Sequence, residues 1–360
     1  MMRMPKCAKW PRRACLSYNM HNDNRPSVSV LLPFHNAAAT LAECIESILA
    51  QSLTAIEIIA VNDFSQDGSL QLLQQYNDPR IRVIENHRRG LVSALNTGLA
   101  HCAAPLIARM DADDIMHAAR LEMQYEYLRN HRDLVLVASQ ARKFPQANVR
   151  KGYREYMRWQ NSVLSSDDIC NQIYIESPFA HPSVMFRRDS VIAAGAYRQG
   201  AFPEDYELWL RLQHKGYRME KLPQVLLDWR ESDTRLSRVS DNYARKAFDE
   251  VRAHYLSLDR RIHHKPIAFW GAGRKTRQRA RYLLDKGFEA KVWIDIDPKK
   301  IGNHIRGVEV VEPAWLEQAA VDGRKPFVLN YVTNHGARDI ARTYLERIGY
   351  VMGQDYLEVG

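Results

Sequence analysis

The chain has 360 residues, 46% hydrophobic and 26% charged, and this ordinary globular composition predicts about two domains. No run approaches the roughly 18 apolar residues of a membrane span, and five scattered cysteines without a C-x-x-C pair exclude a disulfide framework or zinc site and favour a reducing cytoplasm. The net charge of +9 fits a partner that is an anionic small molecule or an acidic membrane surface. The basic residues are scattered and form no nucleic-acid-binding motif, so we expect no nucleic-acid partner.

The amino-terminal stretch is strongly basic. Six basic side chains stand against one acid, Asp23, in the first 25 residues, and no apolar run typical of a signal peptide is present. We expect residues 1–26 to be a disordered tail, or an over-extended start before Met20. A weak anchor to anionic lipid is the alternative, which leaves peripheral association with the inner face of the membrane open.

Short apolar strands then alternate with helices. Ser27–Pro33 is rich in β-branched residues and is expected to stop at Pro33, and Thr40 with Glu43 predicts a capping box at the next helix. Further expected elements are strand Ile56–Val61, helix Leu70–Tyr76, strand Ile81–Glu85, helix Leu91–Ala100 and strand Pro105–Ala108. This order predicts an α/β fold with a mixed, mostly parallel sheet flanked by helices, which binds ligands at the carboxyl ends of its strands.

Three carboxylates follow the strand Pro105–Ala108 within four residues, at Asp111, Asp113 and Asp114. Like charges this close raise one another's pKa unless a cation compensates them. Hard oxygen ligands suit Mg²⁺ or Mn²⁺, so a metal site is one interpretation. A polar turn before the helix that starts near Ala118 is the other, and the stretch alone does not decide between them.

Polar clusters also follow the first two strands, at Pro33–Asn36 and Asn62–Ser69. Asp63 stands at a strand terminus and is the better candidate to bind a base or ribose. Asp67 fits an ordinary turn and helix N-cap equally well. Three arginines could supply positive charge to a pyrophosphate: Arg88, Arg89 and Arg109. Each of them could equally be a solvated surface residue.

The region from 140 to 180 is less regular. Lys143–Gln160 is basic and aromatic, and a packed helix is favoured over a mobile flap or acceptor surface. His181 precedes a proline and is either structural or an acceptor contact. Three strands are expected, at Ser183–Phe186, Tyr217–Lys221 and Val225–Trp229. Arg230–Asp241 is expected to be a loop over the site, and a charged helix should follow from 242 to about 258.

Glu204 and Asp205 form a second acidic centre, in the first turn of a helix that carries Trp209. Acids in this position favour the helix dipole, so their spacing alone points to a structural role.

A second strand–helix pattern begins near residue 265. Strand Ile267–Trp270 leads into Gly271-Ala272-Gly273, but Thr276 stands where a dinucleotide fingerprint has its third glycine. Asp295 follows about 20 residues on, where an acid would hold a ribose. We expect a small Rossmann-like domain at 265–360 with a structural, regulatory or oligomerisation role rather than a working cofactor site. Its other expected elements are helix Arg274–Lys286, strand Ala290–Ile294, helix Trp315–Ala320, strand Phe327–Tyr331 and helix Ala337–Ile348.

Residues 27 to about 229 resemble the inverting glycosyltransferases of family 2, which have the nucleotide-sugar-binding GT-A fold. The resemblance rests on four segments in this order and spacing: Val28–Asn36, Val61–Ser69, Gly90–Gly98 and Arg109–Asp114. It departs at His35, where an aromatic residue is frequent. We therefore expect a GT-A domain at 27–262.

The resemblance implies a role for each motif. The residues bordering the nucleotide would be Pro33, Asn36, Asp63 and Asp67. Arg89 stays a candidate pyrophosphate contact from its charge, not from the resemblance. Asp111 would contact ribose or metal, and Asp113 would hold Mn²⁺ or Mg²⁺ at the diphosphate. Asp205 would be the catalytic base, with Glu204 as a neighbour that positions it.

The implied reaction is the inverting transfer of a sugar from a nucleoside diphosphate sugar to an acceptor hydroxyl on a glycan or lipid carrier, in surface polysaccharide or glycolipid synthesis. A sugar nucleotidyltransferase, a non-catalytic nucleotide-sugar-binding protein and an oxidoreductase built on the second unit are the alternatives. The sequence leaves homo-oligomers open.

Overall fold

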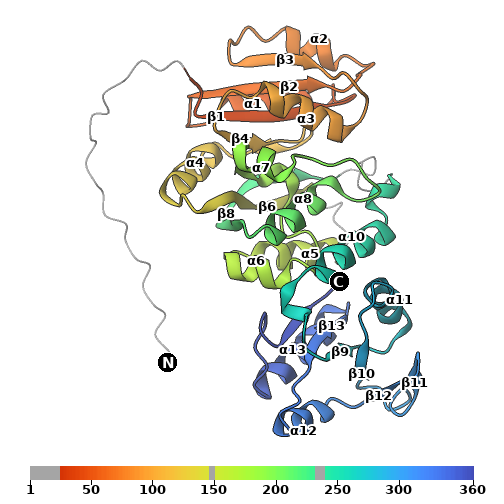
Figure 1. Ribbon diagram of the computed structural model, residues 1–360. Coiled ribbons are helices and arrows are strands. Elements are labelled where there is room, and N and C mark those ends of the chain that lie inside the picture. Colours follow the sequence, from red (N-terminus) through yellow and green to blue (C-terminus); the bar gives the residue numbers. More distant parts are fainter. Residues whose placement is uncertain (1–24, 146–150, 232–239) are drawn as a thin grey trace.

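The computed structural model describes residues 25–145, 151–231 and 240–360, which fold around two β-sheets (Figure 1). Within these residues the larger sheet has eight strands, in the order β3-β2-β1-β4-β7-β6-β8-β5. Their bounds are β1 (Val28–Phe34), β2 (Ile56–Asn62), β3 (Ile81–Glu85), β4 (Leu106–Arg109), β5 (Ile115–Met116), β6 (Leu134–Phe144), β7 (Met185–Arg187) and β8 (Arg218–Arg230).

The larger sheet is mixed but mostly parallel, as predicted. Strands β3, β2, β1 and β4 are parallel neighbours. Strand β7 is antiparallel to both β4 and β6, while β6 and β8 pair in parallel. The helices of this unit are α1 (Leu41–Leu49), α2 (Ser69–Gln74), α3 (Leu91–His101), α4 (Arg120–Asn130), α5 (Lys151–Ser162), α6 (Ser166–Gln172), α7 (Arg188–Ala194), α8 (Glu204–His214) and α10 (Arg245–Ser257), with short 3-10 turns η2 (His181–Ser183), η3 (Asp241–Tyr243) and η4 (Arg260–Ile262).

The two faces of the larger sheet carry different helices. Helix α1 buries Leu41, Ile45 and Ile48 against one face of β1 and β2, because these side chains recur at helical spacing. Helix α3 packs on the opposite face, where Leu95 and Leu99 join the core. All seven residues of β1 are buried, which explains its nearly continuous apolar run.

A smaller sheet forms the second unit, with the order β11-β12-β10-β9-β13-β14. All its pairings are parallel except that of β11 with β12. Its elements are β9 (Ile267–Trp270), α11 (Arg274–Leu284), β10 (Ala290–Ile294), β11 (His304–Ile305), β12 (Val308–Val311), α12 (Trp315–Val321), β13 (Phe327–Asn330), α13 (His335–Arg347) and β14 (Tyr356–Glu358). This is the small Rossmann-like arrangement that the sequence predicts.

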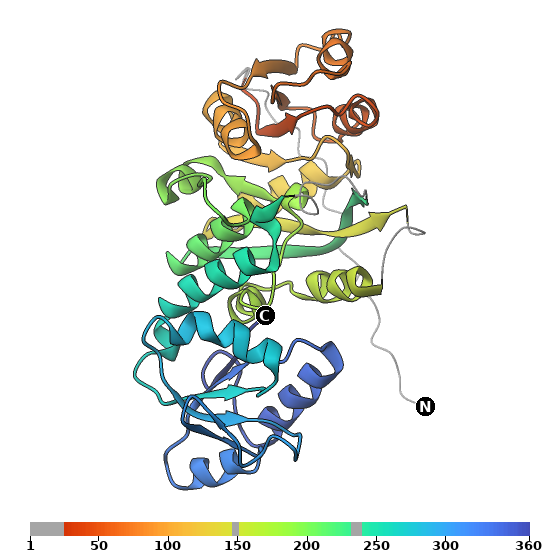
Figure 2. The same cartoon turned by 90° about the vertical axis from the view of Figure 1, so that its right-hand side faces the viewer.

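The two units pack against each other. Both views place the second unit below the first, with α10 near their boundary (Figures 1 and 2). Tyr255 and Leu256 of α10 belong to the same apolar cluster as Leu283 of α11. The Gly360 amide donates to the Tyr174 carbonyl at 2.8 Å, which also ties the second unit to the first. Because one core serves both units, the domain limits 27–262 and 265–360 stay a prediction.

Several local predictions were wrong. Thr40 makes no side-chain cap at α1, so the capping box is absent; its hydroxyl donates to the Ala112 carbonyl at 3.0 Å instead, and Glu43 pairs with Arg230. Pro33 lies inside β1, which runs on to Phe34. Residues 181–183 form a 3-10 turn before β7, and one long strand, β8, replaces the two expected between 217 and 229. The polar run 230–241 lies mostly outside the described residues, as do residues 1–24 of the expected tail.

Candidate active site

Three loops of the candidate site begin at one edge of the larger sheet. Strands β2, β1 and β4 are parallel neighbours, with Phe34 paired to Asn62 and Leu31 paired to Arg109. The loops that carry Asn36, Asp63 and Asp111 therefore leave the sheet at the carboxyl ends of adjacent strands, where ligands of such sheets bind.

Asn36 joins the loop after β1 to the loop after β2. Its side-chain oxygen accepts the Gln66 amide at 2.8 Å, and its own amide donates to the Ser65 hydroxyl at 3.1 Å. The backbone φ of 49° at Asn36 is left-handed, a conformation that asparagine tolerates better than most residues. Pro33 is buried in β1 beneath this loop. Arg89 is exposed, with Nη2 3.5 Å from Nε2 of His35, so it flanks the same edge.

Asp63 is buried and organises the loop before α3. Its Oδ1 accepts the side-chain amide of Asn86 at 2.7 Å, and both carboxylate oxygens lie within 3.0 Å of the Gly90 amide. Gly90 has φ of 124°, which favours glycine because a side chain would be strained there. Asp63 thus fixes the shape of the pocket edge. A carboxylate has about four lone-pair positions, so it retains acceptor capacity for a ligand.

Asp67 uses its carboxylate within the loop. Its Oδ2 accepts the Ala38 amide at 3.0 Å, and its Oδ1 accepts the Ser69 amide at 3.0 Å as well as the Ser69 hydroxyl. Burial acts to raise the pKa of Asp67, but the hydrogen bonds from Ser69 and Ala38 outweigh it and lower this pKa below its ordinary value. A contact of Asp67 with the nucleotide stays a prediction.

Replacing Asp67 by Ala should lower the stability of the protein by about 1–2 kcal/mol, because two backbone amides lose their acceptor. Thermal unfolding of the variant measures this loss, and Glu46→Ala, at an exposed acid on α1, is the control. A rise in donor KM with an unchanged Tm would instead point to direct contact with the donor.

The Asp-rich stretch after β4 gathers three carboxylates. One oxygen from each of Asp111, Asp113 and Asp114 lies within 4.8 Å of the others, and among the described residues this is the one acidic group with metal-binding spacing. Asp111 and Asp113 are half-buried, and Asp114 is buried. Asp114 Oδ1 accepts the Arg230 amide at 2.7 Å, so this acid holds the end of β8 in place.

Arg109 is the cation beneath this cluster. It is 1% exposed, and its Nη1 lies 2.6 Å from Oδ1 of Asp111. A guanidinium buried this deeply needs a carboxylate partner to offset its lost hydration. Arg109 therefore orients Asp111 from inside the protein through one carboxylate oxygen, Oδ1.

The second acidic centre lies at the start of α8. Glu204 Oε2 accepts the hydroxyl of Tyr243 at 2.6 Å, and its Oε1 lies 3.8 Å from Nδ1 of His181. Asp205 Oδ1 accepts the Tyr206 amide at 2.7 Å. Burial, and then the charge of Glu204, raise the pKa of Asp205 to about 8. A carboxylate tuned toward neutral pH is suited to general base catalysis.

The two acidic centres act on each other. Burial raises the pKa of Glu204, and the charge of Asp111 adds to this rise while Arg109 opposes it. Burial, and then the charge of Arg109, lower the pKa of His181 well below its ordinary value, so this histidine is neutral. The hydroxyl of Tyr197 lies 2.9 Å from Nε2 of His181, so this tyrosine is also part of the second acidic centre.

Tyr197 and Tyr243 are site residues that the sequence did not reveal. Each is an isolated tyrosine in an unremarkable stretch, and each is brought in by folding: Tyr243 is 39 residues from its partner Glu204. His181 is buried at 7% exposure, in edge-to-face contact with Trp209, which favours the structural interpretation over an acceptor contact.

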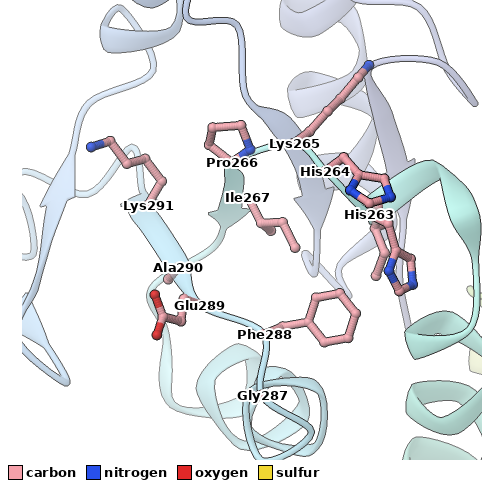
Figure 3. A pocket seen from close by; sticks show the side chains of 11 residues that line it. His263, His264, Lys265, Pro266, Ile267, Gly287, Phe288, Glu289, Ala290 and Lys291 are labelled. Carbon is pink, nitrogen blue, oxygen red and sulfur yellow. The ribbon is translucent and has the colours of Figure 1, made fainter.

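A cavity of about 440 Å³ lies away from both acidic centres, in the second unit. Figure 3 shows its lining, which includes His264, Phe288 and Lys291. It opens at the amino ends of β9 and β10. Since parallel sheets bind ligands at the carboxyl ends, we assign no chemistry to it.

Among the helices of the described residues, none is long and apolar enough to cross a membrane.

Comparison with known proteins gives the family. The model of the family described as glycosyl transferase family 2 matches residues 29–194. The amylovoran biosynthesis glycosyltransferase AmsE of Erwinia amylovora is 34% identical over 236 residues, which cover 64% of this chain and 85% of AmsE. The putative glycosyltransferase EpsE of Bacillus subtilis (strain 168) is also 34% identical, over 61% of this chain and 78% of EpsE.

Two further proteins are informative. The UDP-Gal:alpha-D-GlcNAc-diphosphoundecaprenol beta-1,3-galactosyltransferase of Escherichia coli is 28% identical over 65% of this chain and 84% of its own. The crystal structure of S. aureus TarS 1–349 with UDP-GlcNAc superposes with a TM-score of 0.51 at 15% identity, over 64% of this chain and 72% of that one, which shows a shared GT-A fold. The family model and the 34% identical relatives, most of whose length is matched, show that this chain belongs to glycosyltransferase family 2.

Proposed function

We propose that the chain is a metal-dependent, inverting glycosyltransferase that moves a sugar from a nucleoside diphosphate sugar to an acceptor hydroxyl. One observation carries this proposal: the carboxylate cluster at the strand ends is close enough to Glu204 and Asp205, two acids with raised pKa values, that the charge of Asp111 helps to raise the pKa of Glu204. The first suits a metal-bound diphosphate, and the second suits proton removal from an acceptor.

The donor set fits a divalent cation. Three carboxylates within 4.8 Å provide the hard oxygen ligands that Mn²⁺ and Mg²⁺ prefer. We assign Asp113 and Asp111 to the metal, because Asp114 Oδ1 already accepts the Arg230 amide. When bound, the cation would neutralise charge that develops on the departing diphosphate. Asn36, Asp63, Asp67, Arg89 and buried Pro33 are proposed to shape the nucleotide side of the pocket.

Asp205 is proposed to take the proton from the acceptor hydroxyl as its oxygen attacks the anomeric carbon. A single displacement of this kind inverts the configuration and needs one base on the acceptor side. Glu204 is engaged by Tyr243 at 2.6 Å, so we assign it to positioning Asp205 and raising its pKa. A glycosidase would need two carboxyl groups flanking the scissile bond.

Two relatives support a proposal for the acceptor class. One is named for amylovoran biosynthesis, and another for transfer to GlcNAc on diphosphoundecaprenol. We propose that this chain likewise extends a glycan or a lipid-linked acceptor in polysaccharide or glycolipid assembly.

The proposal predicts turnover of a sugar nucleotide in the presence of Mn²⁺, with inversion at the anomeric carbon. The test incubates the full chain with UDP- and GDP-sugars and a lipid diphosphate-linked GlcNAc acceptor, and then assigns the product linkage by NMR. An α-linked donor should give a β-linked product, and EDTA should stop release of the nucleoside diphosphate. Retention of configuration, or pyrophosphate release from NTP and sugar phosphate, would contradict the proposal.

A further inference from the structure

A second cavity, of about 250 Å³, opens at the carboxyl ends of the smaller sheet. Three loops line it: the one after β9, the one after β10 and the one after β13. The lining residues used below are Gly271, Gly273, Thr276, Asp295, Ile296 and Ile340. None of them belongs to the candidate active site.

The position of the cavity follows from the strand order. Strand β9 lies between β10 and β13, so the chain leaves β9 toward one side of the sheet and later returns to its other side. The loops after β9 and β13 then diverge and leave a crevice between them. Such switch points are where open parallel sheets bind their ligands.

One end of the cavity suits a phosphate. Gly273 precedes α11 and has no side chain, so the first amides of this helix are not capped by a side chain. The first turn of α11 holds no acid, and Arg274 and Lys275 are basic. Gly271 has φ of 106°, and a Cβ there would lie 2.9 Å from the Thr276 hydroxyl, so glycine keeps this loop close to the cavity.

The wall beside this loop suits a ribose. Asp295 is 7% exposed and lines the cavity. Its Oδ2 accepts the Ala272 amide at 2.8 Å and its Oδ1 accepts the Asp297 amide at 3.0 Å. These bonds, with the Lys300 ammonium 3.2 Å away, hold the carboxylate in place. Lys300 also lines the cavity and donates to both oxygens, at 3.3 and 3.2 Å, so a ribose hydroxyl would bind Asp295 by replacing this ammonium contact.

The mouth of the cavity is apolar. Ile296 and Ile340 are 61% and 63% exposed, respectively, although both are large hydrophobic residues. Ile296 lies in the loop after β10 and Ile340 lies in helix α13, and both line the same cavity. Two exposed aliphatic side chains at the rim of a polar cavity fit the faces of a flat base, which would cover them.

The size of the cavity limits the ligand. A volume of about 250 Å³ is below the roughly 300–1,000 Å³ of pockets that enclose whole drug-sized ligands. The cavity can therefore enclose part of one nucleoside phosphate, with the rest in solvent. A single nucleoside is favoured over a dinucleotide because Thr276 stands in place of the third glycine of the dinucleotide fingerprint.

We propose that this cavity is a second nucleotide site, which binds a single nucleoside phosphate without a metal ion. The phosphate lies at the start of α11, the ribose hydroxyls face Asp295, and the base lies between Ile296 and Ile340. The metal-binding group found among the described residues, at 111–114, lies on the larger sheet and takes no part. The inference stands independently of the proposed function.

The test is calorimetric titration of the full chain with ADP, GDP, CDP and UDP in EDTA, which removes the metal that the donor pocket needs. At least one nucleotide should bind with one equivalent per chain, and NAD⁺ should bind at least tenfold more weakly. Gly273→Asp should weaken binding at least tenfold by placing an anion at the phosphate position. This variant should fold, since the extended backbone at Gly273 suits an aspartate N-cap and a Cβ meets nothing there.

Two further variants sharpen the test. Ile340→Glu changes the opposite end of the cavity at an exposed position and should also weaken binding at least tenfold. Val321→Asp adds a negative charge to the same unit at an 83% exposed position outside the cavity and should change the affinity less than twofold. Asp113→Ala should leave binding in EDTA intact.

The proposal is overturned if no nucleotide binds in EDTA, or if Gly273→Asp and Ile340→Glu both retain the wild-type affinity. Binding in EDTA that is unchanged by both Gly273→Asp and Ile340→Glu would place the nucleotide in the donor pocket instead. Tighter binding of NAD⁺ than of every mononucleotide would refute the assignment to a single nucleoside.

Discussion

Asp205→Asn should reduce sugar transfer by about 10²- to 10⁴-fold while leaving donor affinity nearly unchanged, because removal of a general base affects the chemical step. The amide keeps the size of the side chain and can still accept the Tyr206 amide, now at 2.7 Å from Oδ1. Initial rates with saturating donor and acceptor measure the loss. Calorimetric titration with the nucleoside diphosphate and Mn²⁺ measures the retained affinity.

The same variant should be more stable than the wild type at neutral pH. The pKa of Asp205 is raised to about 8 by burial and by Glu204, so the folded chain binds this proton more tightly than the unfolded chain does. Wild-type stability is therefore lost as the pH rises from the unfolded pKa, about 4, toward 8. The Tm advantage of Asp205→Asn should grow over this range and then level off, which thermal unfolding at several pH values can follow.

Asp167→Asn is the matched control. Asp167 also lies in the first turn of a helix, α6, but it is exposed and outside the acidic centres. It should keep full transfer activity and show no pH-dependent gain in Tm. Near wild-type turnover by Asp205→Asn would show that another group removes the acceptor proton.

The parallel half of the larger sheet could be predicted because β1 and β2 are buried on both faces and read as apolar runs. Strand β6 could not, because its second half carries polar residues that only the fold buries. Lys143, for example, is 5% exposed and lies 3.5 Å from the centre of the Trp229 ring on β8. The antiparallel strand β7 has three residues, too few for any sequence pattern.

The candidate acids could be found because clustered carboxylates at strand ends are costly without a partner. The separate role of each acid could not be predicted, since it depends on hydrogen-bond partners far away in the chain. The Arg230 amide that occupies Asp114 is 116 residues from it. Partners distant in the chain also explain why the predicted capping box is absent. Thr40 and Glu43 have the right local spacing, but their side chains bond to Ala112 and Arg230 instead.

The contacts around the Asp-rich stretch also distinguish its structural interactions from the side chain proposed to bind the metal. Asp114 anchors β8, and Asp111 is oriented by the buried Arg109. Arg230 reaches Asp113 through the backbone carbonyl, at 2.6 Å from Nε. A change confined to the side chain of Asp113 therefore keeps this tie between β8 and the loop after β4.

Asp113→Ala should abolish the contribution of Mn²⁺ to donor binding, since it leaves only Asp111 of the two carboxylates assigned to the cation. We expect nucleoside diphosphate affinity in Mn²⁺ to fall by more than about tenfold, or ~1.4 kcal/mol, to the level that the wild type has in EDTA. The part of the nucleotide-induced thermal shift that depends on Mn²⁺ should vanish in parallel, because a ligand stabilises the folded chain only when it binds. Asp189→Ala removes an 85% exposed acid on α7 and should change neither quantity. If Mn²⁺ still tightened nucleotide binding in Asp113→Ala, the cation would lie elsewhere, and the cluster after β4 would be the polar turn that its sequence also allows.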